Sequence, residues 1–133
     1  MSGETPPKGE KDMIFKDTDH RQKYREIIGK MRSRDVYHSA LAYLLALDEN
    51  IHGTRISDCF NFSNDSIKLS VFEEDWITGT DRRVIQLGFN LWNSAQEANV
   101  SDVFSAGDDL EYLFEAVRIR LGESDMHIHS VMQ

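Results

Sequence analysis

The chain has 133 residues, of which 40% are apolar and 10% aromatic, so it can build one hydrophobic core and is not disordered throughout. Its net charge of −8 opposes binding to nucleic acid unless the few cations gather on one face. One cysteine excludes an internal disulfide framework, and no apolar run approaches the length of a membrane span. We therefore expect a cytoplasmic protein that does not associate with membranes.

The domain boundaries follow from where helical patterns begin and end. Both prolines, Pro6 and Pro7, lie near the N-terminus, so the rest of the sequence lacks the residue that most often breaks helices. Residues 1–12 show no apolar periodicity, and we predict a disordered tail there. Residues 13–122 are predicted to form a single all-helical domain, and residues 123–133 a polar C-terminal tail.

Two helices are predicted near the start of the domain. Asp17 to Asp19 can cap a helix that runs to about Met31. The segment from Lys16 to Arg34 holds seven Lys or Arg against three Asp or Glu, so this helix is basic. The second helix, about Asp35 to Leu47, is apolar nearly all round, which is typical of a helix buried against several neighbours.

A third helix is predicted from Ser66 to Trp76. It ends in the acidic cluster Glu73, Glu74 and Asp75, where the helix dipole disfavours negative charge. The turn Thr78-Gly79-Thr80 follows and can cap the next helix. Because a local conflict of this kind sometimes marks a functional site, we regard this turn as a candidate binding surface.

The central helix is predicted over Val84–Ala95, directly after the turn. Its apolar face contains Val84, Leu87, Gly88, Leu91 and Trp92. A glycine in mid-helix costs about 1 kcal/mol relative to alanine, so Gly88 indicates a close crossing with another helix. Arg83, Gln86, Asn90 and Asn93 form a polar stripe on the other side.

The last helix is predicted from about Asp108 to Leu121. Its core face is assigned to Leu110, Leu113, Phe114, Val117 and Leu121, and its surface to Glu111 and Glu115. Together these patterns predict an all-α fold, a single compact irregular bundle of five or six helices. The helices at Asp35–Leu47 and Val84–Ala95 are expected at its centre.

Five segments of the chain form a pattern that is similar to a known family: Phe15 with His20, residues 35–45, residues 76–80, residues 88–93 and residues 114–120. They resemble a family of small proteins of unknown function from low-GC Gram-positive bacteria and their mobile elements. The resemblance covers most of residues 14–121, and the sequence departs from the family pattern at Ile77 and Asp81. It implies a bacterial or phage cytosolic protein.

Catalytic and metal-binding patterns are weak. His127 and His129 have a ligand-like spacing, but a structural zinc site needs four ligands, so we predict no metal and no cofactor. Cys59, between Asp58 and Phe60, is interpreted as a small core residue. A metal-dependent hydrolase that uses the acidic clusters at Glu73–Asp75 and Asp108–Asp109 remains an alternative.

A helix-turn-helix regulator is a second alternative. The predicted helix at Ser66–Trp76, the turn and the following helix have that outline. Arg82 and Arg83 could meet phosphates, while Gln86 and Asn90 face base edges. The neighbouring acids would repel DNA, so direct nucleic-acid binding is disfavoured.

The preferred hypothesis is a non-enzymatic protein-interaction module. One form of it is an acidic inhibitor or modulator of a nucleic-acid-processing defence complex, since carboxylates on a rigid surface reproduce a phosphate field. A protein partner is expected, and a homodimer is left open. The predicted partner-binding residues are Glu73, Glu74, Asp75, Thr78, Thr80, Arg82, Arg83, Gln86 and Asn90.

Overall fold

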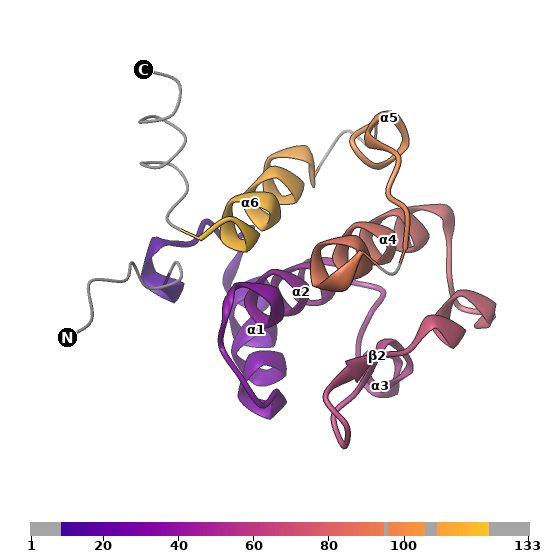
Figure 1. The fold of residues 1–133 in the computed structure, drawn as a ribbon. Helices are drawn as coiled ribbons and strands as arrows, with labels where there is room; N and C mark the ends of the chain where they lie inside the picture. Colours follow the sequence, from indigo (N-terminus) through magenta and orange to yellow (C-terminus); the bar gives the residue numbers. More distant parts are fainter. Residues whose placement is uncertain (1–8, 95, 106–108, 123–133) are drawn as a thin grey trace.

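The computed structural model describes residues 9–94, 96–105 and 109–122. Within these residues the chain forms an irregular bundle of six α-helices with one two-stranded sheet, so the predicted all-α fold is confirmed (Figure 1). In chain order the elements are η1 (Glu10–Asp12), α1 (Thr18–Lys30), α2 (Val36–Leu47), α3 (Thr54–Cys59), β1 (Phe60–Asn61), β2 (Ser66–Ile67), η2 (Leu69–Glu73), α4 (Gly79–Asn93), α5 (Val100–Val103) and α6 (Leu110–Arg120).

Helix α2 lies at the centre of the bundle. Every residue from His38 to Leu47 is buried, and α2 packs against α1, α4 and α6 (Figure 1). A helix without a polar face must be covered on all sides. The predicted central position of the second helix is therefore confirmed.

Acceptor side chains fix the start of the three longest helices. Asp17 accepts from the backbone N–H of His20 at 2.8 Å, and Asp35 accepts from that of His38 at 2.9 Å. Thr78 and Asp81 form a reciprocal capping box at the start of α4. These bonds satisfy N–H groups that a helix leaves unpaired in its first turn.

The buried His38 ties the β1–β2 hairpin to the start of α2. Its Nδ1 lies 2.7 Å from Asp35 Oδ1 and its Nε2 lies 2.6 Å from Asp65 Oδ2. Burial alone would lower the pKa of His38, but hydrogen bonds and charges from Asp65 and Asp35 outweigh it and raise the pKa. A protonated ring donates to both carboxylates at once. The His38 ring also packs edge-to-face against Trp92, with 4.6 Å between the ring centroids.

The prediction of a helix over Ser66–Trp76 is wrong. Ser66 and Ile67 instead pair with Asn61 and Phe60 in a short antiparallel hairpin, and only the 3₁₀ helix η2 follows. Asp65 turns the chain with a positive φ of 56°. Phe60 is fully buried and so anchors β1 to the core, and the strand pairing places Ile67 beside Phe60.

The N-terminal segment is attached further upstream than predicted. Glu10–Asp12, placed in the tail by sequence, form η1, and Glu10 Oε1 accepts from Arg25 Nε at 2.8 Å. Further along, the N–H of Ile14 donates to Glu115 Oε2 at 3.0 Å, and its carbonyl accepts from the hydroxyl of Tyr43. Residues at the two ends of the described chain are thus joined by direct bonds.

Gly88 marks the crossing of α4 over α2, as predicted. A Cβ built on Gly88 would lie 3.0 Å from Leu41 Cδ1 and 3.6 Å from Leu44 Cδ1. Gly29 in α1 has no atom within 4 Å of the corresponding point. The glycine at 88 therefore has a packing role that the glycine at 29 lacks.

We predict that Gly88→Val lowers the free energy of unfolding by about 1–3 kcal/mol, because its extra methyl groups must enter a packed crossing. Gly88→Ala should change it by less than about 1 kcal/mol, since better helix propensity offsets a small shift of the flexible Leu41 side chain. Urea unfolding measures both values. The same substitutions at Gly29 serve as controls, and equal losses at the two sites would refute the packing role.

Candidate functional site

The predicted acidic cluster is exposed. The side chains of Glu73, Glu74 and Asp75 are exposed and show no hydrogen bond or ion pair with another described residue. They lie at the end of η2 and in the turn after it, not at the end of an α-helix. The predicted conflict with a helix dipole is therefore wrong, because the aligned peptides that create the dipole are missing.

The two threonines of the predicted site differ. Thr78 is the N-cap of α4, and its backbone N–H donates to Asp81 Oδ2 at 2.8 Å. Its hydroxyl is used in holding the turn. Thr80 is exposed in the first turn of α4.

A buried carboxyl pair, which the sequence did not reveal, lies beneath this turn. Asp48 at the end of α2 and Asp81 at the start of α4 are 8% and 2% exposed. Asp81 Oδ2 also accepts from Asn50 Nδ2 at 2.6 Å. The pair joins the ends of two helices that are far apart in the sequence.

One proton is shared within the pair. Burial and the nearby Asp81 raise the pKa of Asp48 to about 7. Burial alone would also raise the pKa of Asp81, but hydrogen bonds from Asp48, Thr78 and Asn50 outweigh it and hold this pKa below its ordinary value. If Asp48 were ionised, its buried Oδ2 would accept no hydrogen bond from the described residues. When Asp48 is protonated, its hydroxyl donates to the ionised Asp81, and both carboxyl groups are satisfied.

Arg82 and Arg83 lie near the start of α4, and Arg82 is held in place by its neighbours. The guanidinium of Arg82 donates to the carbonyl of Phe72 at 3.2 Å and lies 5.5 Å from the centre of its ring. Arg83 is half-buried. Because the helix predicted over Ser66–Trp76 does not form, α4 lacks the first helix of a helix-turn-helix unit, and that alternative loses its structural basis.

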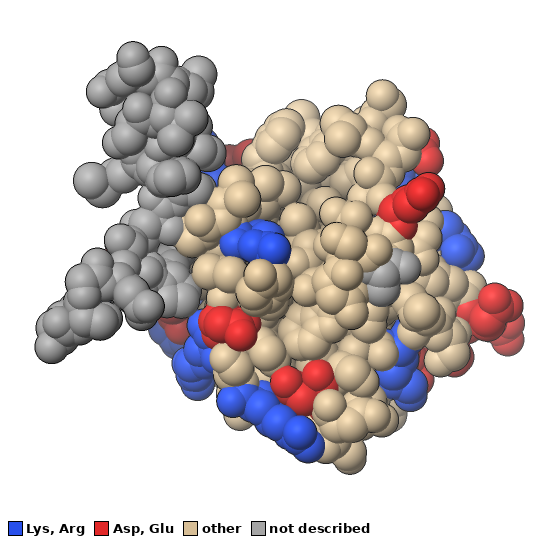
Figure 2. All heavy atoms as spheres, viewed as in Figure 1, with Lys and Arg blue, Asp and Glu red and all other residues tan. Residues whose placement is uncertain are grey.

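Three cations of the basic segment, Lys16, Lys23 and Arg25, are also engaged within the chain. Lys16 pairs with Asp109 at 3.1 Å, and Arg25 pairs with Glu10 at 2.7 Å. Lys23 donates to the carbonyl of Asp48 at 2.7 Å. On the face shown in Figure 2, blue and red side chains are interspersed around largely uncharged surface, so this face offers no continuous cationic patch to a phosphate backbone.

Gln86 and Asn90 line a polar hollow of about 510 Å³, away from the acidic cluster. Asn90 Nδ2 donates to the carbonyl of Gln96 at 2.9 Å, which closes the connection after α4. The predicted partner-binding residues thus divide between the turn and this hollow. The hollow is lined by Gln86, Asn90, Gln96, Glu97, Ala98, Asn99 and Asp102.

The cysteine and the histidines weighed for chemistry in the sequence lie at different places in the chain. Cys59 is fully buried, as expected of a core residue, and burial raises the pKa of its thiol to about 12, so it is a poor nucleophile. His127 and His129 lie outside the described residues. Among residues 9–94, 96–105 and 109–122, no three His, Cys, Asp or Glu side chains group closely enough to hold a metal ion.

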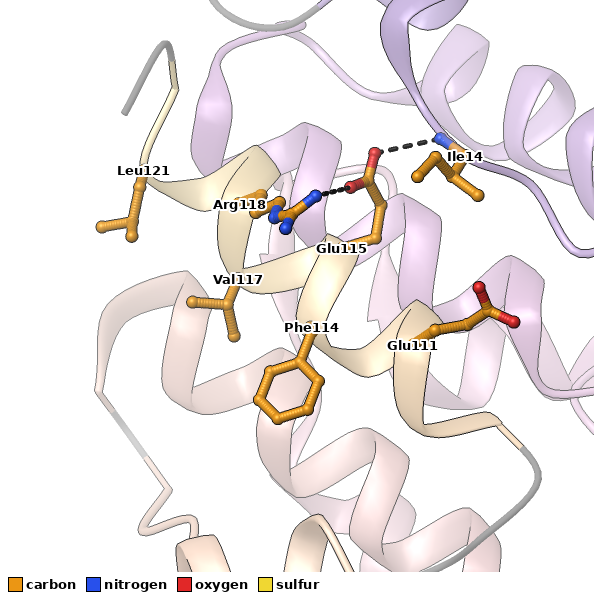
Figure 3. A pocket seen from close by; sticks show the side chains of 7 residues that line it. All are labelled: Ile14, Glu111, Phe114, Glu115, Val117, Arg118 and Leu121. Carbon is orange, nitrogen blue, oxygen red and sulfur yellow. Dashed lines mark hydrogen bonds and ion pairs between the residues drawn. The ribbon is translucent and has the colours of Figure 1, made fainter. Parts of the chain in front are cut away.

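The clearest candidate surface is on α6, where exposed apolar side chains surround a hollow of about 660 Å³ (Figure 3). Phe114, Val117 and Leu121 project from α6, and Ile14 approaches from the N-terminal segment. Glu111 and Arg118 add opposite charges at the rim. We call these six residues the α6 face: Ile14, Glu111, Phe114, Val117, Arg118 and Leu121.

The assignment of the α6 core side from sequence is partly wrong. Leu113 is buried as predicted, but Phe114 and Leu121 are half exposed. The core contacts come instead from Leu113, Ala116 and Ile119, and the supposed surface residue Glu115 is 1% exposed. The sequence does contain a signal for this arrangement, since apolar residues occupy two faces of the helix and only one can face the core.

We predict that Asp48→Asn removes a pH dependence of stability. In the wild type the folded pKa of about 7 lies above the unfolded value of about 4, so the free energy of unfolding falls as pH rises between them, by about 1.4 kcal/mol per unit. The variant should be about 4 kcal/mol more stable than wild type at pH 8 and similar at pH 4. Urea unfolding across pH measures the difference. Asp75→Asn, which changes an exposed acid, is the control, and an unchanged slope in Asp48→Asn would contradict the prediction.

The comparisons with known proteins match the chain to a family of unknown function. No curated protein and no solved structure matches the chain. Within the described residues, no helix has both the length and the apolar character needed to cross a bilayer. A family described as of unknown function, DUF6075, matches residues 10–132, which include η1, all six helices and residues beyond α6. The chain therefore belongs to this family.

Proposed function

We propose that the chain is a non-enzymatic protein-interaction module and that the α6 face is its docking surface. One observation carries this proposal: Ile14, Phe114 and Leu121 are 47%, 50% and 50% exposed around one hollow. Contiguous exposed apolar surface is characteristic of partner-binding sites. Aromatic residues and arginine are also enriched at interfaces, and Phe114 and Arg118 lie together here.

The α6 face is already ordered before a partner arrives. The ring of Phe114 stacks on Phe104 with 4.7 Å between centroids and 11° between planes. Ile14 is held by backbone bonds to Glu115 and Tyr43. Side chains that are fixed in advance lose less conformational entropy on binding. This supports a dedicated docking surface.

Photo-crosslinking tests the docking surface. A benzophenone amino acid in place of Phe114 should form covalent adducts with protein on irradiation, both in cells that carry the natural gene and in the purified chain, because the side chain is half exposed within the proposed interface. The control position is Leu69, an apolar residue of similar exposure, 51%, on η2. Gel electrophoresis and mass spectrometry identify the adducts. Equal yields at the two positions, or no adduct at position 114 in either sample, would refute the proposal.

A second candidate uses the acidic turn. Here the chain inhibits or modulates a basic, nucleic-acid-processing protein, as its net charge of −8 and its exposed Glu73, Glu74 and Asp75 suggest. The buried Asp48–Asp81 pair and the capping box hold this turn, so its carboxylates stand on a rigid base. A fixed set of charges steers association better than a mobile one.

For this candidate we predict that the triple variant E73Q/E74Q/D75N loses protein capture from nuclease-treated bacterial lysate, while its free energy of unfolding changes by less than about 0.5 kcal/mol. These side chains have no described partner to lose. The control variant, E26Q/E49Q/E97Q, removes three exposed acids elsewhere and reaches the same net charge. Affinity purification with mass spectrometry compares them. Equal loss in both variants, or recovery of nucleic acid only, would rule out the acidic turn as a specific site.

A further inference from the structure

Four apolar residues at the C-terminal end of the described chain, three of them in the α6 face, follow a pattern that suits pairing of two helices. Leu110, Phe114, Val117 and Leu121 are spaced by four, three and four residues. This is the spacing of the seam between two packed helices. Leu113, Ala116 and Ile119 already cover the side of α6 that faces the core. The seam is therefore a second apolar side of α6, from which Phe114, Val117 and Leu121 project around the hollow (Figure 3).

The charges beside the seam indicate what covers it. Glu111 and Arg118 are seven residues apart, so they lie on the same flank of α6, with Phe114 between them. Both are exposed, and the side chain of Arg118 is 53% accessible although it also contacts Glu115. An acid and a base at these two points make the flank complementary to its own reversed copy.

An antiparallel arrangement brings these opposite charges together. A twofold axis at the middle of α6 places Glu111 of each subunit beside Arg118 of the partner subunit. Both of these charge pairs lie on the same side of the two packed helices. The apolar seams then face each other, with Phe114 near the axis. A parallel arrangement would put the two charged flanks on opposite sides of the pair, so these charges would not meet.

We propose that the α6 face binds the α6 face of a second copy of this chain, forming an antiparallel, twofold-symmetric homodimer. This inference rests on the proposed docking role of the α6 face and names its occupant. Ile14 lies beside the charged flank, so the N-terminal segment widens the contact beyond α6 itself. The interface is small, and the dimer dissociates as the concentration falls.

The test is a pair of charge-reversal variants, Glu111→Arg and Arg118→Glu, examined by analytical ultracentrifugation. The wild type should show monomer and dimer in a concentration-dependent equilibrium. Each variant alone places like charges together in both pairs of the dimer, and its dimerisation should weaken by about tenfold. An equimolar mixture should recover the dimer, because the heterodimer has two opposite-charge pairs. Recovery on mixing cannot arise from misfolding or from a segment bound within one chain.

A wild type that stays monomeric at millimolar concentration would overturn the proposal, and so would a mixture no more dimeric than its components. Phe114→Asp gives an independent arm: it should abolish the dimer, whereas Leu69→Asp, at a site of equal exposure, should not. Circular dichroism checks that each variant remains folded. If the purified chain is monomeric while position 114 still crosslinks to another protein in cells, the second copy is refuted and the docking surface stands.

Discussion

The burial of α2 on all sides is the constraint on which the other elements depend. From His38 to Leu47 the helix has no side that water can cover, so α1, α4 and α6 must each supply an apolar stripe to it. Gly88 shows how closely one of them approaches, since even one added carbon would press on Leu41. An interior as dense as this allows small shifts of flexible side chains but little added volume.

Polar clusters hold both ends of this apolar helix. At its start, His38 bridges Asp35 and Asp65; at its end, Asp48 shares a proton with Asp81. Each cluster connects α2 to a segment remote in sequence, the hairpin in one case and α4 in the other. Apolar packing tolerates sliding, whereas a hydrogen bond between buried groups is satisfied in one register only. The clusters therefore fix the position of α2 along its axis.

Much of this architecture could be predicted from the sequence, because it follows local rules. Asp35 and Thr78 are recognisable helix N-caps, and the apolar character of the second helix predicts its central position. The hairpin at Phe60–Ile67 could not, since its strands are two residues long and depend on a tertiary contact. The Asp48–Asp81 pair was also out of reach, because only the fold brings these residues together. On α6 the sequence showed an apolar helix but not which of its two apolar sides faces the core.

The bonds that hold Ile14 have a consequence for recognition. The α6 face combines a residue near position 14 with residues near position 118, and Glu115 links them through the backbone N–H of Ile14. A peptide of the α6 sequence alone would have neither this neighbour nor the length to stay helical in water. The surface is thus a conformational epitope: whatever binds it, an antibody included, distinguishes the folded chain from an unfolded or N-terminally cleaved one.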